Sequence, residues 1–501
     1  MDTTTNLRPF PAINLSNNAI ALNDGTSQWT YTQLRQRIDR LASGLLGKGA
    51  DLKEERVAFF MPAGVDYVTT LLGIWRAGGI AVPLNIAAAL PEIEHALSSA
   101  KVTRLVVGIS SPAESLTPLH SLCRALGIEV ENVVELLSDK ILVMPELKIE
   151  RRAMMLFTSG TTNKPKGVVT THKNIRAQIT TLLEAWKWQD DDSIPLFLPL
   201  HHIHGIINVL CCALWIGARV TLFPRFDMEK ILKQVEDQDY TLFMAVPTIY
   251  VKIIGQLETL TELRRKRICA GFKGMRLNIS GSAACPVKLY NQWKELTGQT
   301  LLERYGMTEI GMGISNPYHG ERRAGAVGIP LPGVEVALFD DTGNIIEGDD
   351  SPGEIRVRGD NVFLEYWDNP QATEDSFIDG WFCTGDVAVR ETDYYRILGR
   401  SSIDIIKSGG YKLSALEIEG TLLTHESVAE CAVIGVEDET WGEAVTAFVV
   451  LKPEQSLEHT ELKKWCEPRM SPYKIPKHLR VVESLPRNAM GKVMKPKLKE
   501  L

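Results

Sequence analysis

A run of hydroxyl, glycine and lysine residues at 155–169, MLFTSGTTNKPKGVV, has the composition of an anion-binding loop. Small hydroxyls, free backbone N–H groups and a lysine are groups that bind the oxygens of a polyphosphate. Pro165 stands where a Walker A loop has its second glycine, so that general motif does not fit. Taken alone, the segment is compatible with a phosphate-binding loop or with an ordinary surface turn.

The segment LERYGMTE, residues 302–309, places Arg304 just before an aromatic-glycine run that ends in Glu309. A guanidinium stays charged at physiological pH, and burying it without an anion is costly. Arg304 therefore needs either an internal acid, such as the neighbouring Glu303, or the acid group of a ligand. The planar fork of arginine binds a carboxylate through two parallel hydrogen bonds.

The segments around these motifs alternate between apolar, strand-like runs and helical patterns. Strands are predicted at 55–61, 80–85, 104–108, 193–200, 219–224, 241–246, 276–281 and 300–306. Helices are predicted at 65–79 and 91–100 and from Gly205, Asp227, Pro247 and Cys285. Continuous apolar strands between helices predict parallel sheets that are covered on both faces, an α/β class.

The pattern changes near residue 325, where 333–347 and 353–359 alternate polar and apolar residues around the turn DDTGN. A polar, glycine-containing break follows at 399–413. We predict a large N-terminal body (1–399) of parallel-rich sheets with flanking helices and a β-rich subdomain. A hinge (400–402) and a small, mobile α+β C-terminal domain (403–501) follow, with Ser414 and Glu417 as a capping box.

The composition is that of a globular enzyme, with 44% apolar and 23% charged residues. A net charge of -7 argues against nucleic acid and anionic membranes as partners. The eight cysteines include no CxxC pair, which favours reduced thiols. The longest apolar stretch, 205–218, is shorter than the roughly 20 residues of a membrane span. We therefore expect a cytoplasmic protein with no membrane span and no obligate protein partner.

Five motifs in order carry a resemblance to a known family. They are LFTSGTTNKPKG (156–167), PLHHIHG (199–205), ERYGMTE (303–309), GWFCTGD with YYRILGR (380–386 and 394–400) and PRNAMGK (486–492). Together they resemble the adenylate-forming superfamily of acyl-CoA synthetases, luciferases and peptide-synthetase adenylation domains, almost from end to end. The resemblance implies that the chain joins an acid to AMP at the expense of ATP and then transfers the acyl group to coenzyme A, while the C-terminal domain rotates.

The resemblance also implies roles for single residues in nucleotide binding. The loop that holds the β- and γ-phosphates corresponds to Thr158, Ser159, Gly160, Thr161, Thr162 and Lys166. The adenine site corresponds to Gly281, Ser282, Ala283 and Tyr305, and the ribose site to Asp386 and Arg400. Asn163 stands where the family usually has glycine, and we expect the loop to tolerate it because Asn accepts a positive φ.

Further residues correspond to the catalytic and coenzyme A sites. Glu309 is expected to position Mg²⁺, with Thr308 beside it in the catalytic group, and Lys492 to bridge the substrate carboxylate and the α-phosphate. Gly409, Gly410 and Tyr411 are expected to line the path of coenzyme A. Ser402 occupies the hinge position.

The acid site corresponds to His202, His204 and Arg304. The two histidines lie two apart, on one face of a predicted strand, but no cysteine or carboxylate accompanies them as a metal site would require. Synthetases for aromatic or fatty acids commonly have a small residue at the position of Arg304. The chain looks most like malonyl-CoA synthetases, which activate malonate and often methylmalonate, so Arg304 is expected to bind a second carboxylate.

Three other interpretations remain open. The chain is also compatible with a short-chain, aryl or fatty acyl-CoA synthetase in which Arg304 pairs with an internal acid. A second alternative is an adenylation enzyme that loads a carrier protein in trans. A nucleotide-binding pseudoenzyme is the third, although Lys166, Glu309, Asp386 and Lys492 are all present.

Overall fold

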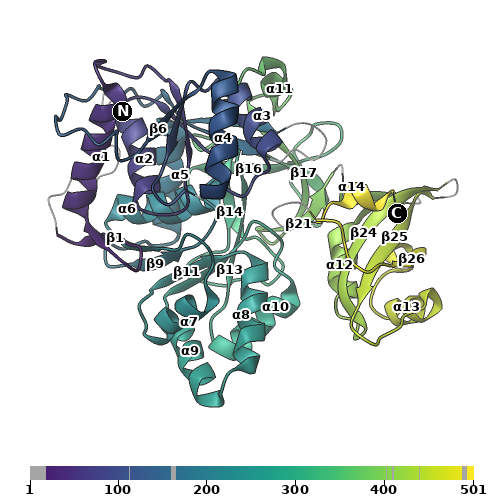
Figure 1. Cartoon of the computed structure of the whole chain (residues 1–501). Helices are drawn as coiled ribbons and strands as arrows, with labels where there is room; N and C mark the ends of the chain where they lie inside the picture. The colour runs from purple at the N-terminus through teal and green to yellow at the C-terminus, as the bar shows by residue number, and fades with distance from the viewer. Residues whose placement is uncertain are drawn as a thin grey trace.

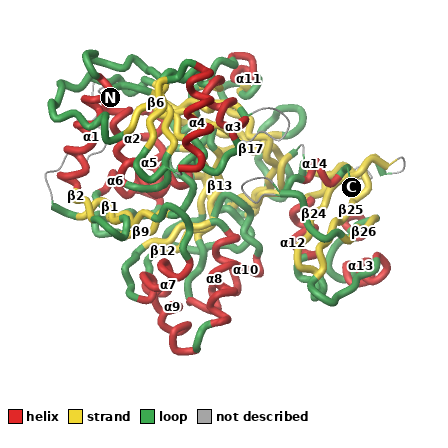
Figure 2. Tube along the Cα trace, in the orientation of Figure 1, coloured by secondary structure: helices red, strands yellow, loops and turns green. Residues whose placement is uncertain are grey.

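The computed structural model describes residues 18–111, 113–158, 165–401, 403–408, 411–438, 441–487 and 493–500, to which the following statements refer. Figure 1 shows a large body, built from the purple to green part of the chain, and a smaller yellow-green C-terminal unit joined to it near β21. In Figure 2, helices lie around the strands of the body. The expected α/β class and the division into a large and a small part are confirmed.

A seven-stranded sheet in the order β18-β8-β7-β4-β3-β5-β6 forms one half of the body. Its strands are β3 (Arg56–Phe60), β4 (Ile80–Pro83), β5 (Arg104–Val107), β6 (Glu129–Asn132), β7 (Arg152–Thr158), β8 (Lys166–Thr171) and β18 (Glu365–Tyr366). The helices of this half are α1 (Tyr31–Leu46), α2 (Val65–Arg76), α3 (Leu90–Ser99), α4 (Ala113–Leu126) and α5 (His172–Ala185). The strands from β6 to β7 are parallel, as predicted.

Strand β3 shows why these strands lack polar alternation. Val57 and Phe59 pack into the core cluster that contains residues of α1, α2 and α5, whereas Ala58 and Phe60 pack into the cluster of α3 and α4. Both faces of the strand are therefore buried, as expected for a parallel sheet covered by helices on both sides.

Two further sheets form the other half of the body. The first has the order β2-β1-β10-β9, with β1 (Ile20–Asn23), β2 (Gln28–Thr30), β9 (Ser193–Leu196) and β10 (Arg219–Leu222). The second has the order β11-β12-β13-β14-β15, with β11 (Leu242–Ala245), β12 (Leu277–Ser280), β13 (Leu302–Met307), β14 (Gly311–Ser315) and β15 (Ile329–Pro330). The helices are α6 (Cys212–Ile216), α7 (Met228–Glu236), α8 (Pro247–Thr259), α9 (Glu262–Gly274) and α10 (Val287–Thr297).

The segment after β9 departs from the prediction. His202 and His204 do not share a strand, because β9 ends at Leu196 and a π-helix, η2 (His204–Cys211), begins at the second histidine. Pro199, which has no N–H to donate to a neighbouring strand, lies between the two elements. The helix predicted from Gly205 is present, but its first part is wound as a π-helix.

A β-rich part follows, as predicted. Its sheet is antiparallel, in the order β16-β17-β20-β19 with β21 against β20. The elements are β16 (Val334–Phe339), β17 (Gly353–Gly359), α11 (Pro370–Glu374), β19 (Phe377–Ile378), β20 (Trp381–Glu391) and β21 (Tyr394–Arg400).

The C-terminal unit has a sheet in the order β23-β22-β25-β24, with β26 against β25. Its elements are β22 (Ile405–Ser408), β23 (Tyr411–Ser414), α12 (Ala415–Leu422), β24 (Val428–Asp438), β25 (Gly442–Leu451), α13 (His459–Cys466), η3 (Pro472–Lys474), β26 (His478–Val481) and α14 (Lys495–Leu498). Ser414 caps α12 by accepting from the N–H of Glu417. The exact boundary at 400–402 stays a prediction, because Ser402 lies outside the described residues.

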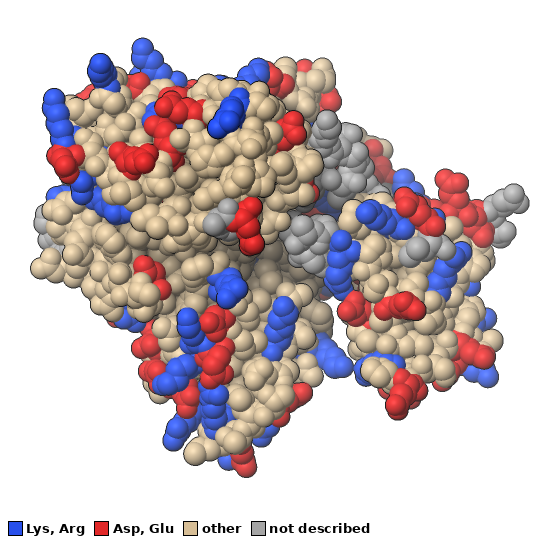
Figure 3. All heavy atoms as spheres, viewed as in Figure 1, with Lys and Arg blue, Asp and Glu red and all other residues tan. Residues whose placement is uncertain are grey.

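The protein has a net charge of -7, and its surface carries charged side chains of both signs (Figure 3). On the face that Figure 3 shows, basic and acidic side chains are interspersed, most clearly over the lobe that contains α7 and α9. Ion pairs on this lobe join Arg264 to Glu229 and Glu236, and Lys266 to Glu262. In the described part of the chain, no helix has the length and apolarity that a membrane crossing requires.

A buried lysine joins the end of the chain to the start of the C-terminal unit. The Nζ of Lys495 lies 2.6 Å from an Asp404 carboxylate oxygen and 2.7 Å from one of Glu419. Glu419 also accepts from the N–H of Val433, at 2.7 Å. Asp404 accepts from the N–H of Arg400, at 3.1 Å. One cation therefore holds two buried carboxylates, and its loss leaves both unpaired.

Replacing Lys495 by Met should destabilise the C-terminal unit by about 3–5 kcal/mol, because removing one partner leaves buried charge uncompensated. Burial raises the pKa of Glu419 and Lys495 opposes that shift, so without the lysine Glu419 would favour its protonated form and the deficit should shrink as the pH falls. Calorimetric unfolding at neutral and acid pH measures both effects. Lys497→Met, at an exposed position of the same helix, is the matched control. A Lys495→Met unfolding profile equal to that of the control would contradict the prediction.

Candidate active site

The predicted phosphate loop connects two antiparallel strands of the seven-stranded sheet. Thr158 is the last residue of β7, Lys166 is the first of β8, and the two are paired in register. Ser159, Gly160, Thr161 and Thr162 lie outside the described residues. The structure therefore places the two ends of this loop at one point, and the strands that carry them are buried.

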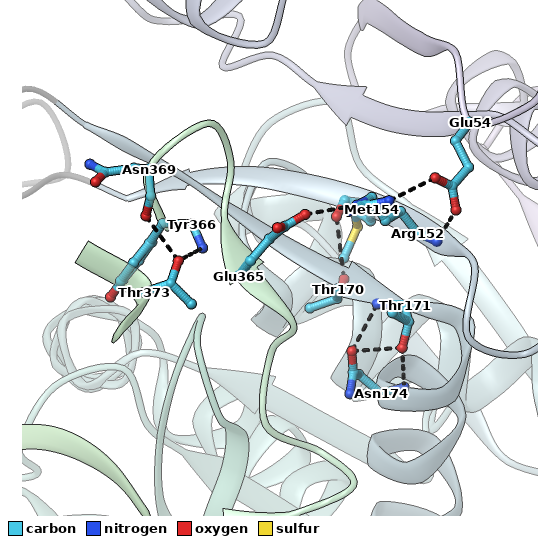
Figure 4. A network of polar contacts seen from close by, with 10 residues as sticks. All are labelled: Glu54, Arg152, Met154, Thr170, Thr171, Asn174, Glu365, Tyr366, Asn369 and Thr373. Atoms are coloured by element: carbon cyan, nitrogen blue, oxygen red, sulfur yellow. Dashed lines mark hydrogen bonds and ion pairs between the residues drawn. The ribbon is translucent and has the colours of Figure 1, made fainter. Parts of the chain in front are cut away.

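A network of polar contacts braces this hairpin (Figure 4). The guanidinium of Arg152, at the start of β7, donates to Glu54 at 2.9 Å and to Glu365 of β18 at 2.7 Å. Thr171, at the end of β8, caps helix α5 by exchanging hydrogen bonds with Asn174. The contacts fix β18 against the hairpin, and β18 carries the next residue of the site, Tyr366.

Tyr366 joins Glu309 to the β7–β8 hairpin, which carries the predicted phosphate loop. Its hydroxyl donates to a Glu309 oxygen at 3.0 Å, and the Nζ of Lys166 lies 4.6 Å from the centre of its ring. Glu309 follows β13, in the turn that also contains Thr308, and only 5% of it is exposed. Burial raises the pKa of Glu309, while the Tyr366 hydroxyl and the nearby charges of Arg400 and Lys166 oppose that shift. Glu309 is therefore an inward-facing carboxylate with cations nearby.

Tyr366 was missed by the sequence reasoning. It lies 57 residues from Glu309 and belongs to none of the five motifs. The strand pairing of β18 with β8 brings it to the site. A local pattern in the sequence does not signal such a contact.

The residues predicted to bind adenine and ribose come together on neighbouring elements. The hydroxyl of Tyr305 donates to one Asp386 oxygen at 2.6 Å, and the Nε of Arg400 donates to the other at 3.1 Å. Asp386 and Arg400 face each other in the register of β20 and β21. The loop with Gly281, Ser282 and Ala283 begins directly after β12, the parallel neighbour of β13, on which Tyr305 lies. Burial and the charge of Asp386 raise the pKa of Tyr305, so its hydroxyl stays protonated.

Arg304 is buried without an anionic partner. It is 4% exposed, its Nε donates to no atom in the described structure, and its Nη2 makes one long hydrogen bond, of 3.4 Å, to the Ser282 hydroxyl. None of the described carboxylates lies within ion-pair distance of it. Burial lowers the pKa of Arg304 to about 9, which leaves it charged at neutral pH.

The neighbouring acid does not serve as that partner. Successive side chains of a strand point to opposite faces, and Glu303 accepts instead from the N–H of Cys285, at 3.0 Å. Burial raises the pKa of Glu303 to about 7. The interpretation in which Arg304 pairs with Glu303 is therefore wrong for this structure.

His204 and Gly281 complete the surroundings of Arg304. The Nδ1 of His204 lies 3.2 Å from the Ser282 hydroxyl, and its Nε2 is buried without a partner in the described structure. Burial and the charge of Arg304 hold the pKa of His204 well below its ordinary value, so the ring is neutral. A Cβ on Gly281 would lie 2.4 Å from the guanidinium carbon of Arg304, so any larger residue there would displace the guanidinium from its observed position. Ser282 itself is exposed, so this group of residues reaches the surface at that side chain.

Of the remaining predicted residues, His202 is described, whereas three others are not. The ring of His202 lies 4.2 Å from that of His201, and burial lowers the pKa of His202 to about 4. Among the described residues, no cluster of three or more His, Cys, Asp or Glu side chains could hold a metal ion. The predicted Gly409, Gly410 and Lys492 lie outside the described residues.

Tyr411 is described and is 54% exposed. Its ring stacks on that of Tyr473, 37% exposed, with 4.4 Å between centres and 3° between planes. The contact joins the beginning of β23 to η3. Sequence reasoning missed Tyr473, because the two tyrosines belong to separate segments of the chain.

Family models match both parts of the chain. The model described as AMP-binding enzyme covers residues 12–367, and the model described as AMP-binding enzyme C-terminal domain covers residues 417–492. The mitochondrial malonate–CoA ligase ACSF3 of Mus musculus is 41% identical over 96% of this chain and 88% of its own length. A malonate–CoA ligase of Arabidopsis thaliana is 39% identical over 90% of this chain and 78% of its own length.

Solved structures of CoA synthetases have the same fold as this chain. ATP-bound MatB from Rhodopseudomonas palustris is 31% identical and superposes with a TM-score of 0.90, covering 100% of this chain and 99% of its own. The o-succinylbenzoate CoA synthetase MenE from Bacillus subtilis, in complex with an acyl-adenylate, is 27% identical with a TM-score of 0.85, covering 97% and 96%. The resemblance carried by the five motifs is thus confirmed, and this chain belongs to the AMP-binding enzyme family.

Proposed function

We propose that this protein is an ATP-dependent malonate:CoA ligase, with methylmalonate as a second candidate substrate. The observation that supports this most directly is the buried guanidinium of Arg304, for which the described residues supply no counter-ion. A diacid supplies one, because the carboxylate that does not react can bind the guanidinium while the other is activated. The relatives named malonate–CoA ligases support the same substrate.

The first step joins the reacting carboxylate to AMP. A carboxylate oxygen attacks the α-phosphorus of ATP, forming an O–P bond, while the P–O bond to pyrophosphate breaks. Both reactants are anions, so groups that neutralise charge in the transition state contribute most. We assign this role to Lys166 and the phosphate loop, and to Lys492, whose position the structure does not describe.

The second step uses the thiol of coenzyme A. Its sulfur attacks the acyl carbon, the C–O bond to AMP breaks, and the thiol proton leaves to solvent. No nucleophilic side chain is required. We propose that Tyr411, with Gly409 and Gly410, lines the approach of the thiol after the C-terminal unit has rotated about residues 400–402. The exposed stack of Tyr411 on Tyr473 supports this assignment, because the site lies at the surface of that unit.

Glu309 is the residue that would hold Mg²⁺. A buried carboxylate suits this hard cation, which takes one or two protein carboxylates and completes its octahedron with water and phosphate oxygens. When bound, Mg²⁺ would neutralise charge on the phosphates. Tyr366 keeps one Glu309 oxygen in place and favours its ionised form.

The site of action in the cell remains a prediction. The sequence favours the cytoplasm, whereas the similar ligases of mouse and human are named as mitochondrial proteins. Fractionation of native cells, with an antibody to this chain, distinguishes the two locations.

The substrate is tested by measuring pyrophosphate release with malonate, methylmalonate, succinate, acetate and 4-coumarate. Malonate should give the highest kcat/KM, and coenzyme A should be consumed in proportion. Release of pyrophosphate without formation of a CoA thioester would favour a carrier-loading enzyme instead. Acetate or 4-coumarate turned over as well as malonate would refute the proposal.

Replacing Arg304 by Ala should lower kcat/KM for malonate by about a hundredfold, because two charge-assisted hydrogen bonds are lost. The KM for ATP should change much less than the malonate constant, since Arg304 and Tyr305 point to opposite faces of β13 and Arg304 touches the predicted adenine loop only through one long contact to Ser282. Arg304→Lys keeps the charge but not the fork, so it should recover only part of the activity. Steady-state kinetics with malonate and with ATP give both constants. Unaltered malonate kinetics in the Ala variant would disprove the assignment.

Replacing Tyr366 by Phe removes the hydroxyl that donates to Glu309 and keeps the ring next to Lys166. The hydroxyl lowers the pKa of Glu309, so its loss should raise that pKa and move the acid limb of the pH–rate profile to higher pH. The Mg²⁺ concentration for half-maximal activity should rise several-fold. Tyr31→Phe, which removes a buried hydroxyl bonded to the Ala218 carbonyl, is the control and should change neither value. An unshifted acid limb in Tyr366→Phe would count against the role given to this hydroxyl.

A further inference from the structure

Asn208 is a buried amide without a hydrogen-bond partner. It lies within the π-helix η2, none of its surface is exposed, and both its nitrogen and its oxygen lack a partner in the described structure. An unsatisfied buried polar group costs about 1–3 kcal/mol, and most buried side-chain polar atoms have a partner. Such a group therefore requires an explanation.

The winding of η2 places Asn208 next to His204. One turn of a π-helix takes between four and five residues, because its hydrogen bonds run from residue i to i+5. Asn208, four residues after His204, thus lies on the same face of the helix, one turn further. The Nε2 of His204 is also buried and without a partner in the described structure. Two unsatisfied groups therefore follow each other along one helix face.

Arg304 faces the same region from the sheet. In the antiparallel pair β13–β14, Arg304 is opposite Ser315, so the two side chains lie on one face. The Ser315 hydroxyl accepts from the indole N–H of Trp186, at 3.0 Å, and Trp186 directly follows α5. Helix α5 packs against η2. The face of Arg304 is therefore the one covered by α5 and η2.

Ser282 connects the two walls, since its hydroxyl contacts both Arg304 and His204. The unsatisfied groups of this region are then the Nε of Arg304, the Nε2 of His204 and the amide of Asn208. Of these groups, only Arg304 carries charge.

We infer that Asn208 is a specificity-determining residue whose amide N–H binds the substrate carboxylate that Arg304 holds. The inference rests on the proposed function and adds a second contact for the far end of the diacid. A carboxylate has about four acceptor positions, of which a bidentate guanidinium satisfies two. In a buried pocket the others also need donors, and a neutral amide supplies them without neutralising Arg304.

The chemistry of the amide explains why neither an aspartate nor a leucine would do the same at this position. An aspartate there would pair with Arg304 and exclude the substrate. A leucine, which has the same branched shape, would leave no unsatisfied polar group, and a purely structural role would favour it. The amide is thus a polar group retained at the expense of stability, as binding residues often are.

Replacing Asn208 by Leu tests the inference. The kcat/KM for malonate should fall at least tenfold, the KM for ATP should stay unchanged, and butyrate, which has an apolar far end, should be used better than by the native enzyme. The melting temperature should be equal or higher, because an unsatisfied amide has been removed. A folded variant with native malonate kinetics would overturn the inference.

A second variant, Asn208→Asp, keeps the test decisive if the first does not fold. Its carboxylate should pair with Arg304, abolish malonate turnover and shift preference toward malonamate, the monoamide of the same acid. Unchanged preference between malonate and malonamate would overturn the inference by itself. Native enzyme and Arg304→Ala, assayed in parallel, distinguish a failure of the proposed function from a failure of the role inferred for Asn208. If native enzyme does not use malonate, the proposed function fails, and if only the Asn208 variants behave as native, the inference alone fails.

Discussion

The buried charge of Arg304 is the constraint around which the acid end of the site is arranged. A guanidinium enclosed in protein is tolerated when an anion completes its surroundings, and the described residues offer none. Gly281 leaves room for the group, Ser282 contacts it, and His204 remains neutral beside it. Each of these residues lies beside a positive charge that no described carboxylate balances.

The two faces of strand β13 separate the proposed acid site from the proposed ribose site. Arg304 points toward the helices α5 and η2, whereas Tyr305 points toward Asp386 of the β-rich sheet. The turn that follows carries Glu309 toward the phosphate hairpin. One strand and its turn thus reach the proposed acid, nucleotide and metal sites, and the side-chain alternation of a strand accounts for the division.

A chain of polar contacts runs from this site into the C-terminal unit. Arg400 binds Asp386 through its side chain, and its backbone N–H donates to Asp404, which pairs with Lys495. The contact between Arg400 and Asp404 spans the predicted hinge at residues 400–402. Rotation about that hinge would therefore act on the Arg400–Asp404 contact first, which couples the proposed ribose site to the position of the smaller unit.

The sequence by itself determined the fold class and the two-part organisation, and it predicted candidate residues for the site, because apolar strand periodicity and short motifs are local properties. The phosphate hairpin, the turn with Glu309 and the pair Asp386–Arg400 all follow from such segments. Only the tertiary structure decided which side chains from other segments contact these motif residues. It removed Glu303 as a partner of Arg304, and it placed His202 in a loop and His204 at the start of a π-helix instead of on one strand. It also brought in Tyr366, Tyr473 and Asn208. These results depend on burial and on contacts between segments far apart in the chain, and the free energy of a buried polar group is set by neighbours that no local pattern specifies.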